Sequence, residues 1–284
     1  MEKNICKNLA GEDNKSFLID ESYDIKRGFI ILAGPSGCGK GEIGRGLCKT
    51  LSLPESNHLS MGSILRDLVT YSKKKLEVNN LSLDECGISD NICIFDLNKN
   101  SEDTVKDAIR NEFDLLKANH KEKKFISQLD WLEFCLNAGL LIPDQWTISI
   151  IKSMISKFQP LKDNIFILDG YPRTISAAEH LLTILDEMNI PVIKVIHIFI
   201  TKTEMKNRTL NRGREDDNFE ALERRYKFYT EQVQPTMDYF KLKLGTSAVK
   251  LIDGHQPQID KEGGFNISAS ISEVLKNVIE ALWD

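Results

Sequence analysis

The sequence lacks an apolar run long enough to cross a bilayer. Its longest apolar stretches, Gly28–Ala33 and Ile196–Ile200, are far shorter than the ~20 residues of a transmembrane helix. The first residues carry acidic side chains and have neither the apolar core nor the small-residue cleavage pattern of a secretory signal. We therefore expect a cytoplasmic protein with no membrane partner.

Positive charge is also in short supply. The 37 lysines and arginines are outnumbered by 42 aspartates and glutamates, for a formal net charge of -5 at pH 7. This balance argues against a general basic coat for nucleic acid. Any binding of anions must depend on basic side chains gathered at one place.

Cysteines and histidines form no recognisable metal site. None of the six cysteines belongs to a CxxC pair, and no histidine pair stands near them at zinc-site spacing. We expect reduced thiols and no zinc. His58 and His197 lie in apolar, strand-like runs and are expected to be hydrogen-bonded structural residues.

What the sequence does contain is an alternation of strand-like and helix-like segments. Such alternation predicts a parallel sheet with helices on both faces. Apolar residues spaced by three and four predict a long helix through Leu222 to Phe240 and a C-terminal helix through Ile271 to Leu282. The five strand-like runs are Gly28–Ala33, Asn57–Ser60, Ile165–Leu168, Val192–Ile200 and Ala248–Ile252.

One segment, from about Tyr71 to Asn137, departs from this alternation. It is polar and lysine-rich, yet Val105 to Leu116 and Phe125 to Leu136 keep apolar residues in helical phase. We expect a helical insertion at residues 71–137 within a main domain of residues 25–284. Residues 1–24 are expected to form a polar N-terminal extension.

A glycine-rich segment follows the first strand and precedes a helical pattern. It matches the G-x-x-x-x-G-K part of the phosphate-binding loop (P-loop) in the context that this motif requires. Glycines let backbone N–H groups point inward, the following helix adds its positive end, and Lys40 supplies a mobile cation for nucleotide phosphates. The loop residues expected to bind the nucleotide are Gly34, Pro35, Ser36, Gly37, Cys38, Gly39, Lys40, Gly41 and Glu42.

The residue after the lysine distinguishes this loop from those of GTPases and ordinary P-loop ATPases. Those proteins carry Ser or Thr there to hold Mg²⁺, whereas this chain has Gly41 and no guanine-reading NKxD motif. Mg²⁺ is then expected to be held by phosphates and water. Asp169, at the carboxyl end of a strand-like run, is the expected carboxylate that orients the hydrated ion.

Six arginines are expected at the same end of the sheet or in the connection beside it. Each guanidinium can grip phosphate oxygens through two hydrogen bonds. Phosphoryl transfer between two anions needs such a concentration of positive charge. Arg224 and Lys227, by contrast, are expected to form ion pairs on a helix surface. The six are Arg66, Arg173, Arg208, Arg212, Arg214 and Arg225.

In their order along the chain, these motifs resemble those of adenylate kinase and the other nucleoside monophosphate kinases. The run Asp-Gly-Tyr-Pro-Arg-Thr at 169–174 is close to a signature of that family. The resemblance implies a P-loop NTPase fold with a five-stranded parallel sheet flanked by helices. Compared with the family pattern, we expect an enlarged monophosphate-binding region, because of the inserted segment 71–137, and a very short lid at 208–217. The matching segments are 34–41, 58–66, 139–144, 168–174, 208–217, Arg225 and 252–254.

The resemblance also implies roles for individual residues. ATP is expected to contact the loop together with Arg208, Arg212 and Gly254, and Arg208 is able to stack on its base. The monophosphate is expected to contact Met61, Arg66, Gly170, Arg173, Ala177, Arg214 and Arg225. The expected catalytic residues are Lys40, Arg173, Arg208, Arg214 and Arg225. Asp216 and Asp217 are expected to fix the lid arginines.

The chain departs from the family pattern at two functional places. Glu42 stands where relatives usually carry threonine, so either its carboxylate points away from the phosphates or donor affinity falls. Met61 and Ala177 stand where adenylate kinases place a threonine and a glutamine at the acceptor adenine. The adenine reader is then missing, and the acceptor is another monophosphate or a wider set.

The sequence as a whole predicts a Mg²⁺- and ATP-dependent kinase of a nucleoside monophosphate, acting by direct in-line transfer. Two alternatives stay open. One is a kinase of another small acceptor, and the other is a catalytically weakened nucleotide-binding regulatory protein whose 71–137 insertion binds a protein partner. The chain is expected to be a monomer without a nucleic-acid partner.

Overall fold

A computed structural model describes residues 27–73, 82–91, 126–157, 164–214, 217–260 and 262–283. Residues 1–24, the Val105–Leu116 pattern and Asp216 lie outside the described residues, so the expectations placed on them stay predictions. None of the helices in the described ranges is both long and apolar enough to cross a membrane.

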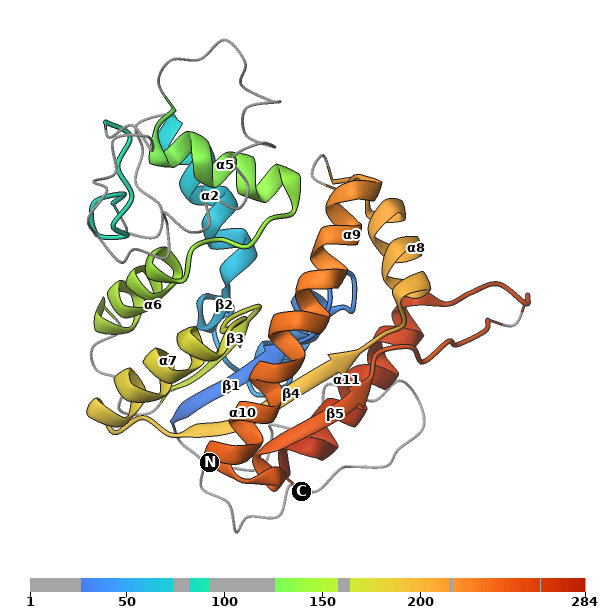
Figure 1. Ribbon diagram of the computed structural model, residues 1–284. Coiled ribbons are helices and arrows are strands. Elements are labelled where there is room, and N and C mark those ends of the chain that lie inside the picture. Colours follow the sequence, from blue (N-terminus) through green and yellow to red (C-terminus); the bar gives the residue numbers. More distant parts are fainter. Residues whose placement is uncertain are drawn as a thin grey trace.

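Five parallel strands form one sheet in the order β2-β3-β1-β4-β5 (Figure 1). This confirms the predicted α/β fold, and each strand begins and ends within one residue of its predicted run. Fully buried parallel strands form continuous apolar runs, which is why sequence identifies them so well. The strands are β1 (Gly28–Ala33), β2 (His58–Ser60), β3 (Ile165–Asp169), β4 (Val192–Phe199) and β5 (Val249–Asp253).

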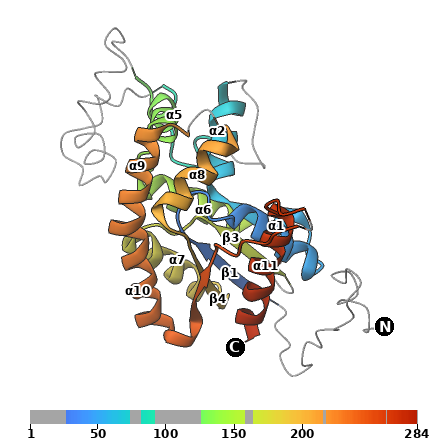
Figure 2. The same cartoon turned by 90° about the vertical axis from the view of Figure 1, so that its right-hand side faces the viewer.

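Helices cover both faces of the sheet, as Figure 2 shows from the side. One apolar core joins the sheet to α2 (Met61–Lys73), α5 (Gln128–Ala138), α6 (Asp144–Lys157), α7 (Ile175–Glu187) and α10 (Gln234–Leu244). The other joins it to α1 (Lys40–Thr50), α8 (Lys202–Arg212) and α11 (Ile267–Trp283). Residues of α9 (Phe219–Phe228) contribute to the second core and pack against the first.

The predicted long helix is continuous but not uniform. Between α9 and α10 the chain forms a π-helical turn, η4 (Tyr229–Val233), and the C-cap of α9 stays in the right-handed helical region. Short 3-10 helices, η1 (Glu55–Asn57) and η5 (Thr246–Ala248), precede β2 and β5. Helix α8 ends at Arg212 with Gly213 as its C-cap, and Asn218 is the N-cap of α9.

The strand register sets the place of the site. Leu32 at the end of β1 is paired with Asp169 at the end of β3, and Ser60 at the end of β2 is paired with Asp169 from the other side. Three loops and helix starts therefore meet at one edge of the sheet, the edge where open α/β sheets bind their ligands.

Candidate active site

The glycine-rich segment forms a loop between β1 and α1, as predicted. Gly34 has φ 145°, and a Cβ at this position would lie 2.2 Å from the carbonyl oxygen of Ile198. Gly39 caps α1 with φ 95°, so the helix begins at Lys40 with free backbone N–H groups in its first turn. The loop is therefore built for close approach of an anion at a helix N-terminus.

Lys40 folds back over this loop. Its Nζ donates hydrogen bonds to the carbonyl oxygens of Gly34 and Pro35, each at 2.9 Å, and lies 3.5 Å from Cys38 Sγ. Cys38 is buried at 2% exposure, which fits a small core residue rather than a ligand contact. The lysine charge is thus fixed at the mouth of the loop.

A cavity of about 760 Å³ runs from the loop across the sheet edge to α2, α5 and α6. Basic side chains outnumber acidic ones on its wall, although the chain is acidic overall. The basic residues are Lys40, Arg45, Arg66, Lys157, Arg173, Arg208, Arg212, Arg214 and Arg225, and the acidic residues are Glu42, Asp67 and Asp169. All six arginines singled out from sequence are among them.

Arg173 stands at the centre of the wall. Its Nε donates to the carbonyl oxygen of Gly170 at 2.7 Å, and its guanidinium carbon lies 5.8 Å from the centre of the Phe228 ring. Burial, together with the nearby charges of Arg225 and Arg66, lowers the pKa of Arg173 to about 10, although Asp169 opposes the shift. The side chain stays charged at neutral pH, and no carboxylate among the described residues forms an ion pair with it, a condition that favours an anionic ligand.

Asp169 is a buried carboxylate at the end of β3. Burial alone would raise its pKa, but His58 and the charge of Lys40 outweigh this effect, so the pKa of Asp169 is lower than usual. His58 Nε2 lies 3.4 Å from Asp169 Oδ2, and this contact is one cause of the lowered pKa of Asp169. The expectation that His197 is hydrogen-bonded is confirmed, because its Nε2 pairs with the Tyr229 hydroxyl at 2.8 Å.

The arginines of α8 and α9 share one carboxylate. Asp217 accepts hydrogen bonds from Arg212 Nε and from Arg225 Nη1, each at 2.8 Å. Arg225 Nη2 also donates to the Leu136 carbonyl oxygen at 3.0 Å, which ties α9 to α5. Asp217 is placed where the sequence interpretation put a support for lid arginines.

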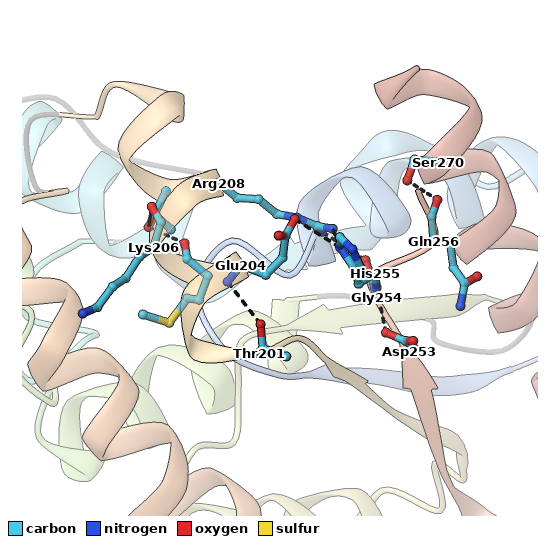
Figure 3. A network of polar contacts seen from close by, with 11 residues as sticks. Thr201, Glu204, Lys206, Arg208, Asp253, Gly254, His255, Gln256 and Ser270 are labelled. Atoms are coloured by element: carbon cyan, nitrogen blue, oxygen red, sulfur yellow. Dashed lines mark hydrogen bonds and ion pairs between the residues drawn. The ribbon is translucent and has the colours of Figure 1, made fainter. Parts of the chain in front are cut away.

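Arg208 and Gly254 meet at the other end of the site. Arg208 Nη1 donates to the Gly254 carbonyl oxygen at 3.0 Å (Figure 3). Arg208 lines the cavity, whereas Gly254 does not. Gly34 and Pro35 line a small adjoining cavity of about 40 Å³.

Comparison with known proteins identifies the family. The family model described as Adenylate kinase matches residues 111–244. An adenylate kinase of Azobacteroides pseudotrichonymphae is 32% identical over 173 residues, which cover 60% of this chain and 80% of that protein. The chain belongs to the adenylate kinase family.

Other family members agree with this result. The adenylate kinase of Mycobacterium sp. (strain MCS) is 28% identical over 217 residues, covering 76% of this chain and 88% of that protein. That of Caldicellulosiruptor bescii is 28% identical over 245 residues, covering 75% and 87%. The P-loop NTPase fold expected from the motifs is therefore the fold of the family.

Two residues expected at the acceptor do not reach the cavity. Met61 and Ala177 are each 1% exposed and pack in the apolar core beneath α2 and α7. Their neighbours Ser60, Gly62 and Ser63 line the cavity instead. The side chains that adenylate kinases use to read adenine thus have no counterpart pointing into the site at these two positions.

Sequence reasoning missed Arg45. It lies on α1 one turn after Gly41, lines the cavity and forms an ion pair with Glu42. The i,i+3 spacing of the two residues is the signal that was available. Glu42 does not simply point away from the site, because it also lines the cavity, but its charge is matched by a neighbouring cation.

The two helix-surface residues behave differently. Lys227 pairs with Glu231 four residues on, as expected. Arg224 Nε donates to the Ala138 carbonyl oxygen at 2.6 Å, so this side chain contacts α5. No ion pair of Arg224 is found among the described residues, and the expected pair stays a prediction.

The donor set fits a hydrated Mg²⁺ ion held mainly by phosphates. Among the described residues, no three His, Cys, Asp or Glu side chains gather as a set of direct metal ligands. Asp169 is one carboxylate with a lowered pKa on the wall of a phosphate-binding cavity. Such a group can accept hydrogen bonds from metal-bound water.

Proposed function

We propose that this chain transfers the γ-phosphoryl group of ATP to a nucleoside monophosphate. The proposal rests on one continuous cavity that extends from the phosphate loop to α2, α5 and α6. Nine basic side chains line this cavity. A site for two anions that must approach each other needs this excess of positive charge.

The donor phosphates would lie along the loop, with Lys40 and the N-terminus of α1 facing them. Arg66 and Arg173 would clamp the acceptor phosphate, because both line the cavity, Arg66 from α2 and Arg173 from the segment that follows β3. Arg214 and Arg225 would face the moving group. Asp169 would hold the water shell of Mg²⁺, which would neutralise charge on the donor phosphates.

The side chains on the cavity wall do not select one particular base of the acceptor nucleotide. Met61 and Ala177 are buried, so base contacts fall to the remaining wall of Leu136, Leu140 and Ile142 and to backbone groups. An apolar wall discriminates poorly between bases compared with a hydrogen-bonding amide. We therefore propose an acceptor other than AMP alone, and the 71–137 insertion as the segment that shapes this end.

The test is nucleoside diphosphate production from ATP and Mg²⁺ with AMP, CMP, UMP, GMP, dCMP and dTMP offered singly. Lys40→Met should lower turnover about 10²-fold or more, because it removes a fixed charge at the donor phosphates. Lys49→Met, an exposed change near the end of the same helix, is the matched control. Absence of transfer to all six monophosphates would overturn the proposal.

A further inference from the structure

The guanidinium of Arg208 is held on three sides (Figure 3). Its Nε donates to Glu204 Oε1 at 2.6 Å, its Nη1 to the Gly254 carbonyl oxygen at 3.0 Å, and its Nη2 lies 3.3 Å from His255 Nδ1. Protein groups thus contact all three nitrogens of the guanidinium and occupy three of its five N–H directions. The planar face and two N–H groups remain available to a ligand.

Arg208 spans the distance from the phosphate loop to the end of β5. A Cβ at Gly37 in the loop would lie 3.5 Å from Arg208 Cβ, so α8 packs directly on the loop. At the far end, Gly254 N donates to the Phe199 carbonyl oxygen at 2.7 Å, which fixes that loop to β4. The guanidinium therefore lies beside the phosphate-binding segment but reaches away from it.

His255 has two mutually exclusive ways to hold this arrangement. Its Nδ1 lies 3.3 Å from Arg208 Nη2 and also 3.3 Å from Glu204 Oε1. Carrying a proton, Nδ1 donates to Glu204, and without one it accepts from Arg208, but one nitrogen cannot do both. Asp253 Oδ1 accepts a hydrogen bond from the His255 backbone N at 2.8 Å and so holds the backbone that carries the ring.

We propose that Glu204 and His255 are positioning residues that hold Arg208 as a flat platform for the base of the donor nucleotide. The inference rests on the proposed function, since it needs a nucleotide whose phosphates occupy the loop. A guanidinium with its edge engaged stacks on a base, whereas one that grips phosphate uses its edge. The family resemblance already implies that Arg208 is able to stack on the base, and Glu204 and His255 are the side chains of this chain that would hold its guanidinium in place for that contact.

The experiment compares ATP with tripolyphosphate, which has the phosphates but no base. Dissociation constants are measured by titration calorimetry for the unaltered protein, Glu204→Ala and His255→Ala. We expect the dissociation constant of ATP to rise roughly tenfold in Glu204→Ala, because a charge-assisted hydrogen bond is lost, and severalfold in His255→Ala. The dissociation constant of tripolyphosphate should stay within about twofold in both.

Conservative variants and a matched control separate positioning from loss of fold. Glu204→Gln and His255→Asn retain an acceptor at the required place and should restore most of the ATP affinity. Glu223→Gln removes an equally helical glutamate that pairs with Lys202 and Lys206, and it should leave both dissociation constants unchanged.

Two results would overturn the inference: unchanged ATP affinity in the alanine variants, or an equal loss of affinity for ATP and tripolyphosphate. Unaltered protein that binds ATP but transfers phosphate to no monophosphate overturns the proposed function alone. The two proposals therefore fail on different measurements.

Discussion

Asp217 and Arg225 form a buried ion pair in which Arg225 Nη1 lies 2.8 Å from Asp217 Oδ1, and the Asp217 side chain is only 1% exposed. The same carboxylate receives Arg212, so two arginines from successive helices depend on one acid. Because Arg225 also bonds to the backbone of α5, this acid fixes the geometry of the cavity where α9 and α5 meet.

Asp217→Asn should lower kcat about tenfold or more with a smaller change in the KM for ATP. The amide offers one acceptor oxygen in place of two, and its N–H groups face a guanidinium, so at least one arginine moves from its position. A shift of about 1 Å in a positioning group can cost up to 10² in rate. Steady-state kinetics with ATP and the preferred monophosphate measure both parameters.

Asp238→Asn provides the control for this prediction. Asp238 is an exposed aspartate on α10 that pairs with Lys241, away from the cavity. Its replacement should leave kcat unchanged. Equal kcat values for Asp217→Asn and the unaltered protein would contradict the role assigned to Asp217.

Glu42 and Arg45 should have opposite effects on donor binding. Both line the cavity, and their side chains are half exposed, at 52% and 54%. Glu42→Gln removes a negative charge beside the phosphate loop and should lower the KM for ATP by about two- to fivefold. Arg45→Gln leaves the Glu42 carboxylate without its partner and should raise the KM.

Ionic strength checks that this effect is electrostatic. Both changes in KM should shrink between 0.05 and 0.5 M salt, since exposed charges are screened over about 10 Å at 0.1 M. Glu55→Gln, a change of an exposed glutamate that does not line the cavity, should not alter the KM. A rise in KM for Glu42→Gln would show instead that its carboxylate assists donor binding.

The strands and the phosphate loop could be predicted from sequence because each depends on local pattern: continuous apolar runs for buried strands, and fixed glycine positions for the loop. The direction of single side chains could not. Met61 and Ala177 stand at motif positions, but both side chains are buried in the apolar core and do not line the cavity. Arg45 belongs to no motif, and His58 begins a matching segment without an assigned role. Only the arrangement of α1 against β2 and β3 brings both to the cavity.

Arg173→Met should increase stability while it abolishes transfer. Burial lowers the pKa of this arginine to about 10, well below its ordinary value, so keeping it charged opposes folding at neutral pH. Unfolded chains bind more protons than folded ones above pH 10, so this penalty declines as pH rises through that range. We expect the variant to be more stable by about 1 kcal/mol, after loss of the Gly170 hydrogen bond.

Thermal unfolding with and without tripolyphosphate tests this trade-off. The anion should stabilise the unaltered protein more than Arg173→Met, because it neutralises the buried cation. Arg224→Met is the control, since Arg224 also bonds to a backbone carbonyl but does not line the cavity. Arg224→Met should be less stable than the unaltered protein but should still transfer phosphate. If Arg173→Met also transfers phosphate, Arg173 is not a catalytic residue.

His197 should make the protein less stable as the pH falls below about 6.5. Burial, with a smaller effect of Lys241 and Lys40 against Asp238, lowers the pKa of His197 to about 4. Between these two values the unfolded chain takes up a proton that the folded protein does not, so the free energy of unfolding falls with pH. The expected loss is about 2 kcal/mol at pH 5 relative to pH 7.

Urea unfolding at pH 7 and pH 5, followed by circular dichroism, measures this loss. His197→Gln keeps a partner for the Tyr229 hydroxyl but cannot titrate, so its stability should fall less between the two pH values than that of the unaltered protein. Tyr229→Phe removes the hydrogen bond and leaves the histidine, and it should retain the full pH dependence. If His197→Gln and the unaltered protein lose the same free energy of unfolding between pH 7 and pH 5, the prediction is wrong. The buried imidazole would then contribute nothing to proton uptake on unfolding, and other groups would cause the sensitivity to acid.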